Sequence, residues 1–389
     1  MKTKSLLWVL ILVLFIITAC SGDEYPAPPE TGDGWGTASP AEVGLDEEMI
    51  DQAIDRINSG EYANVHSLLI VKDGQLVFEE YFDGHVWDYA AERFEGPLVT
   101  FDRDTRHTTM SVTKAFTSAL VGIAIDQGFI ADEGEKLFDF FPEYAQLADE
   151  EKETITLEHL LTMTSGLEWN EVEYSYSEIE NDLIQLFIQE DPVAFMLAKP
   201  LVHEPGTYWY YSGGDVNLLG EVIQHSTGQR MDEFAEEHLF APLGITSYEW
   251  DFINPDLVHA SGNLMLRPRD MAKFGYLILN DGVWQEERIL SSDWLEKTKS
   301  AYAATPWLDS GEQYGYQWWL KRYPYHGDEI TALHRTGWGG QAIAIFDDLD
   351  LVVVFTGGNY VDASPHNEII ERYILPAVKG GDETAFLEP

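Results

Sequence analysis

The pattern of apolar and polar residues predicts a helix and then a β-hairpin near the start of the chain. In SPAEVGLDEEMIDQAIDRINSG, which begins at residue 39, apolar residues recur at helical spacing at Leu45, Ile50, Ile54 and Ile57. The following segment, VHSLLIVKDGQLVFEEYF, has two runs of β-branched and aromatic residues joined by KDGQ. Two such runs around a short turn with glycine are typical of a β-hairpin.

A second hairpin is predicted near the other end of the chain. QAIAIFDDLDLVVVFTGG repeats the pattern, with Asp347 to Asp350 at the turn, and the segments between the two hairpins are mostly helical. We expect both hairpins to pair in one antiparallel sheet, flanked by N- and C-terminal helices, with a mainly helical region inserted. The predicted fold class is α/β, in the form of an α+β sandwich. The sheet part covers about residues 39–110 and 260–389, the helical part about 111–259.

Composition sets limits on what the chain binds. Its 389 residues, of which 45% are hydrophobic, suffice for one large domain or two closely packed ones. The 68 acidic against 23 basic residues give a formal charge of -45, which repels phosphate backbones and anionic membrane surfaces. We therefore expect no nucleic-acid partner. The acidic excess fits a demand for solubility or a saline environment, and the sequence does not separate the two.

The N-terminus is typical of an exported protein. MKTKSLLWVLILVLFIITAC has two lysines and then about 14 apolar residues, fewer than the roughly 20 that a membrane span needs. This predicts a signal peptide over residues 1–19. The ending ITAC resembles a bacterial lipoprotein box, which implies that Cys20, the only cysteine, carries lipid and anchors the protein in the periplasm or at the cell surface. The alternative is an ordinary signal with an unremarkable cysteine.

The stretch after the cysteine predicts a linker. SGDEYPAPPETGDGWGT is rich in Pro, Gly and Asp and has too few apolar residues to build a core. We therefore expect a flexible tether over residues 20–38, followed by a single folded domain over residues 39–389.

One cation stands in an otherwise apolar helix. MSVTKAFTSALVGIAIDQ, residues 110–127, has apolar and small residues on every face, so we expect it to be buried from several sides. Burial of Lys114 disfavours its charged form and lowers its pKa. Ser111, three residues earlier, falls on the same helix face, and a neutral amine beside a hydroxyl is a base beside a nucleophile. The alternative is a lysine whose amine reaches solvent at the helix end.

Two further segments place that pair in a known family. EPGTYWYYSGGDVNLLGEVI and HRTGWGGQAIAIF, together with MSVTK, are similar to the S-x-x-K, Tyr-x-Asn and K-T-G elements of the serine β-lactamase and penicillin-binding-protein superfamily. The resemblance is closest to its branch of esterases, class C β-lactamases, D-aminopeptidases and 6-aminohexanoate-dimer hydrolases. The similar segments extend from about residue 39 to 375 and occur in the same order as in the family. They also include ITLEHLLTMTSGLEW, SGNLMLRPRDMAKFGYLILNDGVW and YGYQWWL.

The resemblance assigns roles to single residues. Ser111 matches the nucleophile that forms the acyl-enzyme, and Lys114 the amine that helps to deprotonate it. In YYSGG the catalytic tyrosine matches Tyr211, which relays the proton between serine and leaving group, and Tyr210 is the second candidate. Without the resemblance, a tyrosine in the run Tyr-Trp-Tyr-Tyr would be assigned to aromatic packing. Ser212 is expected to make loop hydrogen bonds.

The tripeptide Arg335-Thr336-Gly337 stands where the family has K-T-G. The resemblance implies that this strand binds substrate, and that the N–H of Trp338 joins the N–H of Ser111 as the oxyanion hole. Arg335 would bind a substrate carboxylate or hold the tyrosine in its polar form. His334 could take part instead, although a single histidine beside a strand is more often structural.

The sequence also departs from the family pattern. Gly213 replaces the asparagine whose amide β-lactamases use to hold an acylamido side chain, and Arg335 replaces a lysine. Asp215 and Asn217 are candidates to substitute in part for that amide, although Asn217 is expected to be buried or to cap a helix. Penicillin hydrolysis is therefore a weaker prediction than hydrolysis of esters or small amides.

Other chemistries find no support in the sequence. There is no Gly-x-Ser-x-Gly elbow, no His-Glu-x-x-His motif and no Cys/His cluster, so we expect neither metal nor cofactor. Tryptophans near the motifs are expected either in the core or along an aromatic pocket; they are Trp169, Trp209, Trp318, Trp319 and Trp338.

The sequence thus predicts a serine hydrolase that cleaves small carboxylic esters or amides through a Ser111 acyl-enzyme, with Lys114 and Tyr211 as general base and acid. Its substrates would be small molecules or short peptides. Two alternatives stay open: a D,D-peptidase or penicillin-binding activity, and a relative without catalysis that binds the cell wall or another ligand.

Overall fold

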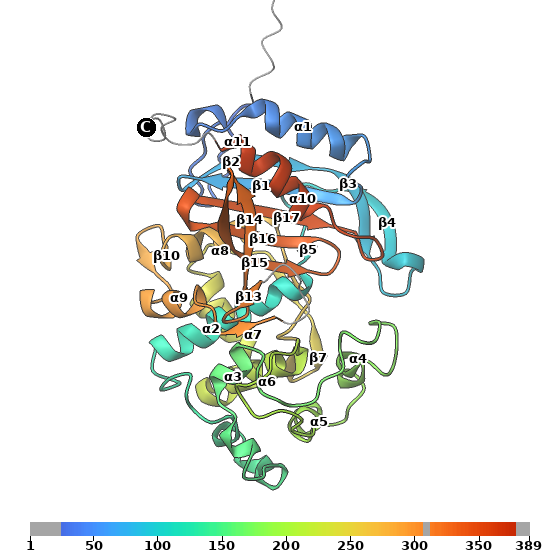
Figure 1. Cartoon of the computed structure of the whole chain (residues 1–389), viewed down its shortest axis with the longest axis vertical. Coiled ribbons are helices and arrows are strands. Elements are labelled where there is room, and N and C mark those ends of the chain that lie inside the picture. The colour runs from blue at the N-terminus through green and yellow to red at the C-terminus, as the bar shows by residue number, and fades with distance from the viewer. Residues whose placement is uncertain (1–24, 306–311, 379–389) are drawn as a thin grey trace, which may run out of the picture.

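The computed structural model describes residues 25–305 and 312–378 (Figure 1). Its helices are α1 (Glu47–Asn58), α2 (Thr113–Asp126), α3 (Leu157–Leu161), α4 (Asp182–Leu186), α5 (Pro192–Leu197), α6 (Gly213–Thr227), α7 (Met231–Ala235), α8 (Pro268–Leu279), α9 (Ser292–Thr298), α10 (His366–Ile369) and α11 (Leu375–Ala377).

The strands are β1 (Val65–Lys72), β2 (Gln75–Tyr81), β3 (Asp83–Trp87), β4 (Glu95–Thr100), β5 (His107–Thr108), β6 (Tyr248–Trp250), β7 (Phe252–Asn254), β8 (Leu257–Val258), β9 (Leu264–Leu266), β10 (Val283–Trp284), β11 (Glu287–Arg288), β12 (Ala303–Ala304), β13 (Gln313–Tyr314), β14 (Trp319–Tyr325), β15 (Asp328–Gly337), β16 (Gln341–Phe346) and β17 (Leu351–Gly357).

Eight of these strands form one antiparallel sheet in the order β12-β13-β14-β15-β16-β17-β1-β2. Both predicted hairpins are present, as β1–β2 and β16–β17. Strand β1 pairs with β17, so Leu69 lies opposite Val354 and the N-terminal and C-terminal hairpins are neighbours in the sheet. The predicted antiparallel sheet with flanking helices is confirmed, and with it the fold class.

Side chains alternate between the two faces of the sheet. In β1, Leu68 and Ile70 pack toward the side of α1, and Leu69 and Val71 pack toward α2 and α8. Figure 1 shows α1 and α11 above the sheet and α8 below it. Each face therefore has its own apolar core, which explains why both central strands are buried along almost their whole length.

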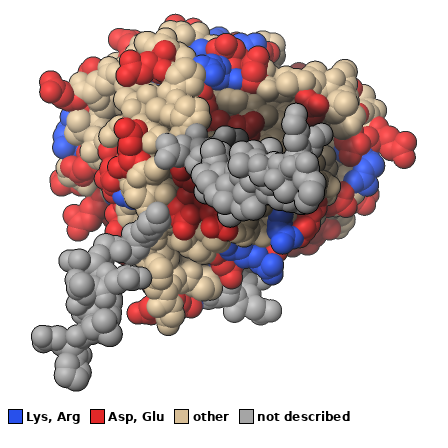
Figure 2. Space-filling model, turned by 90° about the horizontal axis from the view of Figure 1, so that it is seen from above, with Lys and Arg blue, Asp and Glu red and all other residues tan. Residues whose placement is uncertain are grey.

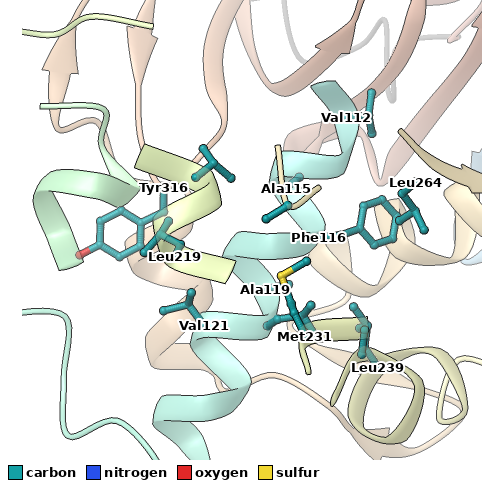
Figure 3. Packing of buried hydrophobic residues seen from close by; sticks show 14 of the residues in the cluster. Val112, Ala115, Phe116, Ala119, Val121, Leu219, Met231, Leu239, Leu264 and Tyr316 are labelled. Carbon is teal, nitrogen blue, oxygen red and sulfur yellow. The ribbon is translucent and has the colours of Figure 1, made fainter. Parts of the chain in front are cut away.

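Helix α2 lies below the sheet, surrounded by other elements. Figure 3 shows side chains of α2, among them Phe116 and Val121, packed against Leu219 of α6, Met231 of α7 and Leu264 of β9. Every residue of α2 from its first to Ala124 is buried. This all-round burial, expected from the sequence, is what removes Lys114 from water.

The predicted flexible tether over residues 20–38 is wrong from residue 25 onward. Trp35 is buried, and Arg269 donates hydrogen bonds from Nη1 to Asp33 and from Nη2 to the Pro29 carbonyl. The composition of the segment suggested that it lacks fixed contacts. Its few aromatic and acidic side chains instead bind to the folded domain, and those partners lie elsewhere in the sequence. Cys20 and the predicted signal peptide lie outside the described residues.

Within residues 25–305 and 312–378, no helix has the length and the apolar character to cross a membrane. Figure 2 shows the face seen from above Figure 1, where acidic side chains are spread widely and basic ones are few. On this face the acidic residues are thus spread out rather than gathered in one patch.

Candidate active site

Ser111 lies in a short 3-10 turn, Met110–Val112, that leads directly into α2. The residue before it, Met110, has a φ of +48°, a left-handed conformation that is unfavourable for a residue with a side chain. Arg335 holds the turn from the other side, because its Nε donates a hydrogen bond to the Ser111 carbonyl at 2.8 Å. The strained turn and this hydrogen bond together fix Ser111 at the start of the helix.

Lys114 is 1% exposed and lies beside the Ser111 hydroxyl. Its Nζ donates to Ser111 Oγ at 3.1 Å and to the Ser261 carbonyl at 2.6 Å. Burial lowers the Lys114 pKa to about 7, while the negative charge of Glu171 raises it and the positive charge of Arg335 lowers it further. Near neutral pH a substantial fraction of the amine is therefore uncharged and able to take a proton.

Tyr211 contacts the same hydroxyl from the opposite side. Its OH donates to Ser111 Oγ at 2.8 Å, and the Lys114 Nζ lies 5.0 Å from the centre of its ring. Burial raises the Tyr211 pKa above its ordinary value, an effect that Arg335 opposes, so the side chain is a neutral phenol at physiological pH. Tyr210, the second candidate, points elsewhere and hydrogen-bonds to Glu173.

Arg335 is fully buried, and its position bears on two predictions. Besides the Ser111 carbonyl, it donates from Nη1 to Tyr314 OH and to the Gln317 carbonyl, each at 2.7 Å. Its Nη2 has no hydrogen-bond partner among the described residues, but the side chain is 0% exposed, so the predicted carboxylate clamp finds no support in these contacts. Arg335 was also predicted to hold the tyrosine in its polar form. The direction of its effect agrees with this role, because the positive charge of Arg335 lowers the Tyr211 pKa.

The end of β15 runs beside the nucleophile. A Cβ added to Gly337 would lie 2.4 Å from the Thr109 carbonyl oxygen and 3.1 Å from the Ser111 nitrogen, so only glycine allows this approach. The Trp338 ring packs against Tyr176, with ring centres 5.4 Å apart. Gly337 therefore passes close to the Ser111 amide, and the N–H of the next residue, Trp338, stays the predicted partner in the oxyanion hole.

Two other residues of this strand lie away from Ser111. Thr336 and His334 line a separate cavity, together with Trp209 and Trp319. His334 is buried, and burial holds its pKa well below the ordinary value, so it is neutral. The structure thus brings Gly337 to the nucleophile and leaves Thr336 and His334 outside its immediate surroundings.

A cavity of about 380 Å³ opens beside Ser111 and Lys114. Most of its wall is apolar or aromatic, formed by Trp87, Tyr89, Met110, Tyr176, Leu183, Ile184, Phe187, Ile188 and Trp338. Phe187 and Ile188 remain partly exposed at 38% and 68%, so the apolar wall continues to the surface at the end of α4. The space is suited to an apolar group next to the reacting carbon.

Glu171 is the main site residue that sequence reasoning missed. It is 1% exposed, lines the cavity and accepts hydrogen bonds from Trp169 Nε1 at 2.8 Å, Tyr176 OH at 3.0 Å and the Gly213 N–H at 2.6 Å. The contact with Gly213 joins segments 42 residues apart, which the sequence alone does not reveal. The one local signal was an acidic residue in the aromatic-rich stretch from Trp169 to Tyr176.

Gly213, predicted to bind substrate, opens α6 behind this carboxylate. Ser212 caps the helix by accepting a hydrogen bond from the Asp215 N–H, in line with its predicted loop role. Asn217 is buried, as expected, and donates to the Gly213 carbonyl at 2.8 Å and to Ser261 Oγ at 3.1 Å. Its amide is therefore engaged within the protein.

Asp215 also lies away from the reacting groups. It accepts a hydrogen bond from Ser165 Oγ at 2.9 Å and lines a different cavity from the one beside Ser111. Burial raises its pKa to about 7. Neither Asp215 nor Asn217 takes the place of the amide that Gly213 lacks.

Comparison with known proteins identifies the family. The chain belongs to the beta-lactamase family, whose model matches residues 51–368. A 6-aminohexanoate-dimer hydrolase of Paenarthrobacter ureafaciens is 26% identical over 275 residues, which cover 65% of this chain and 66% of that protein. A putative D-alanyl-D-alanine carboxypeptidase of Escherichia coli K12 is 26% identical over 60% of this chain, but only 53% of that protein is spanned.

Solved structures share the fold. A putative 6-aminohexanoate-dimer hydrolase from Bacillus anthracis superposes with a TM-score of 0.67 at 22% identity, covering 82% of this chain and 80% of its own. A family VIII carboxylesterase gives a TM-score of 0.65 at 18% identity, covering 84% and 96%. The similar proteins are a 6-aminohexanoate-dimer hydrolase, a putative one, a carboxylesterase and a putative carboxypeptidase, so the chain has the fold of a family of hydrolases.

Proposed function

We propose that this protein is a serine hydrolase that cleaves small carboxylic esters or amides through an acyl-enzyme on Ser111. The observation that carries the proposal is the pair of short contacts to one hydroxyl. Ser111 Oγ lies 3.1 Å from the Lys114 amine and 2.8 Å from the Tyr211 phenol. A partly neutral amine and a phenol on either side of an alcohol form a base, an acid and a nucleophile in contact.

The proposed reaction has two halves. Ser111 Oγ bonds to the substrate carbonyl carbon while its proton passes to the Lys114 and Tyr211 pair. The N–H groups of Ser111 and Trp338 stabilise the resulting oxyanion. The bond to the leaving group then breaks, and Tyr211 supplies the leaving group with a proton. Water adds to the acyl ester by the reverse proton path, which releases the acid and restores the serine hydroxyl.

The cavity supports substrates without a carboxylate near the scissile bond. Its described wall is mostly apolar and includes two carboxylates, Glu171 and Asp251. Arg335, the cation expected to bind a carboxylate, is enclosed by protein groups. A substrate carboxylate would be placed near these two carboxylates while the Arg335 guanidinium is buried, which favours acyl groups without a carboxylate over penicillins and C-terminal peptides.

Active-site labelling tests the proposal. A fluorophosphonate probe should attach covalently to the wild-type protein, and peptide mass spectrometry should locate the adduct on Ser111. The Ser111→Ala variant should give no signal and should not hydrolyse p-nitrophenyl butyrate. Equal labelling of both proteins would reject an acyl-enzyme on Ser111.

A D,D-peptidase or penicillin-binding activity is the second candidate, favoured by the similarity to the putative carboxypeptidase of Escherichia coli. It predicts a long-lived adduct of benzylpenicillin on Ser111, visible in the intact mass. The proposed esterase instead predicts no adduct or one that is quickly hydrolysed, together with turnover of neutral esters. Saturable ligand binding without turnover, unchanged in Ser111→Ala, would indicate a relative without catalysis.

We also propose that the protein is exported and anchored through a lipid on Cys20, with no membrane contact beyond that anchor. Support comes from the sequence ITAC after an apolar leader. The wild-type protein should sediment with membranes and incorporate labelled palmitate, and Cys20→Ser should do neither. Membrane association of Cys20→Ser equal to that of the wild type would contradict a lipid anchor.

A further inference from the structure

The carboxylate of Glu171 fills the space in which a side chain at position 213 would lie. A Cβ built on Gly213 would be 2.6 Å from Glu171 Oε2, closer than real Cβ atoms come to a neighbour, and 3.2 Å from Ser261 Oγ, which is a tight contact. The Gly213 N–H donates to the same Oε2 at 2.6 Å. The Glu171 carboxylate can therefore lie here only because residue 213 has no side chain.

This carboxylate belongs to the wall of the reaction cavity. It lines the same space as Ser111 and Lys114, and Lys114 also donates to the carbonyl of Ser261, whose Oγ borders the Gly213 position. The acyl part of a substrate attached to Ser111 would enter this space. Glu171 is thus part of the wall that such an acyl group would face.

The hydrogen bonds of Glu171 leave one acceptor position unused. Oε2 accepts two hydrogen bonds, from Trp169 and from Gly213, whereas Oε1 accepts one, from the Tyr176 hydroxyl. A carboxylate oxygen has two lone-pair positions. Oε1 therefore has the capacity for one more donor, in a cavity whose other walls are mostly apolar.

We propose that Glu171 determines specificity by selecting acyl groups that carry a hydrogen-bond donor, above all an ammonium group, on the carbon next to the carbonyl. Such a donor hydrogen-bonds to Oε1, while an apolar side chain of the same acyl group occupies the rest of the cavity. An acyl group with only acceptor atoms at that position is repelled by the carboxylate. The substrate class is then an ester or amide of an amino acid with a free amino group. This inference rests on the proposed function.

Three benzyl esters of nearly equal size test the selection. Glycine benzyl ester carries the ammonium, propionate benzyl ester has a methyl group in its place, and methoxyacetate benzyl ester offers only an acceptor oxygen. The ratio of kcat/KM between two esters cancels any effect on the shared Ser111 and Lys114 chemistry. The assays are run at pH 6.5, where an α-amino group with a pKa of about 7.7–8.0 is charged.

The wild type should favour the glycine ester over the propionate ester by at least about tenfold, the effect of one hydrogen bond to a charged group, and should disfavour the methoxyacetate ester. Glu171→Gln should lower the glycine-to-propionate ratio by about tenfold, toward the ratio set by the intrinsic reactivity of the two esters. Gly213→Ala, whose new Cβ displaces the carboxylate, should lower the same ratio. Glu168→Gln is the matched control, since Glu168 lines a different cavity and its loss should leave the ratio at the wild-type value.

Two results would overturn the inference while leaving the proposed function intact. In one, the wild type hydrolyses both esters in a Ser111-dependent way without preference for glycine. In the other, Glu171→Gln slows both esters by the same factor, which would make Glu171 only a link between segments of the fold. If no ester is cleaved faster than by Ser111→Ala, the proposed function fails, and this inference fails with it.

Discussion

At the scale of single residues, the site depends on how burial and charge act together on Lys114. The helix around it removes water, which favours the neutral amine, and Arg335 adds to this effect. Glu171 acts in the opposite direction and keeps the pKa from falling further. The balance at about 7 lies near the pH at which a general base is most effective, because the amine is then both available and still basic.

The pH dependence of kcat/KM should report this balance. Lys114 accepts a proton only when it is uncharged, so activity should rise about tenfold per pH unit below a pKa of about 7 and level off above it. The Tyr211 pKa is raised above its ordinary value, so no loss is expected between pH 8 and 9. Initial rates on a neutral ester over pH 5–9 check this, and a midpoint near the ordinary lysine value would contradict it.

Gly337 should tolerate no side chain. A Cβ there would push β15 away from the Thr109 carbonyl and the Ser111 amide, so Gly337→Ala should lower kcat/KM by roughly a hundredfold and stability by ~1–3 kcal/mol. Gly36→Ala is the control, because the nearest atom to its Cβ would lie at an ordinary 3.9 Å. Ester hydrolysis and urea unfolding measure both effects, and full activity in Gly337→Ala would contradict the close approach.

Sequence reasoning at this scale succeeded where chemistry is local. Ser111 and Lys114 are three residues apart, so their contact follows from helix geometry, and Tyr211 followed from the family pattern. Glu171 could not be found in this way, because its partner Gly213 lies 42 residues further along. Arg335 was named correctly as a site residue but given a substrate role, because sequence does not show on which side of a strand the protein encloses a side chain.

At the scale of elements, one side chain connects strand β15 to the turn that carries the nucleophile. Arg335 bonds to the Ser111 carbonyl, to Tyr314 in β13 and to Gln317, so it joins three segments by one planar group. These hydrogen bonds hold strand β15 of the sheet in a fixed position relative to the turn that carries Ser111.

Arg335→Lys should therefore damage the fold and the rate together. A lysine retains the charge but reaches fewer of the three acceptors, so unfolding free energy should fall by ~2–4 kcal/mol. Hydrolysis of p-nitrophenyl butyrate and of the p-nitrophenyl ester of glutaric acid, which carries a free carboxylate, should fall by the same factor. A selective loss of the carboxylate-bearing ester would show that Arg335 binds substrate after all.

Elements with a strong local pattern were predictable, and short ones were not. The hairpins β1–β2 and β16–β17 show paired apolar runs around a turn, and the buried helix α2 shows a long apolar segment without a polar face. Short strands such as β5, with two residues, and β9, with three, depend on pairing with each other, His107 opposite Leu266, and leave no periodic signal. The ordered segment from residue 25 was missed for a similar reason, since its contacts lie on β2 and α8.

At the scale of the whole molecule, the excess of acidic residues opposes compactness. Broadly spread carboxylates repel one another, and this repulsion is weaker in the expanded unfolded chain. The free energy gained by burying the two hydrophobic cores must exceed this repulsion at any salt concentration at which the protein folds.

Salt should therefore stabilise the protein. Raising sodium chloride from 10 mM to 0.5 M shortens the range over which surface charges repel one another, so the Tm should rise by several degrees. Differential scanning calorimetry at pH 7.5 measures the change. A Tm that stays constant or falls would mean that the exposed acidic groups are already offset by specific pairing.

The most direct test of the account is the rate at which a fluorophosphonate labels Ser111 in the wild type and in Lys114→Ala, followed by mass spectrometry from pH 5 to 9. The account predicts a wild-type rate that rises to a plateau with a midpoint near 7, and a rate at least a hundredfold lower in Lys114→Ala. Equal rates in the two proteins would contradict it, because the amine beside Ser111 would then have no part in making the hydroxyl reactive.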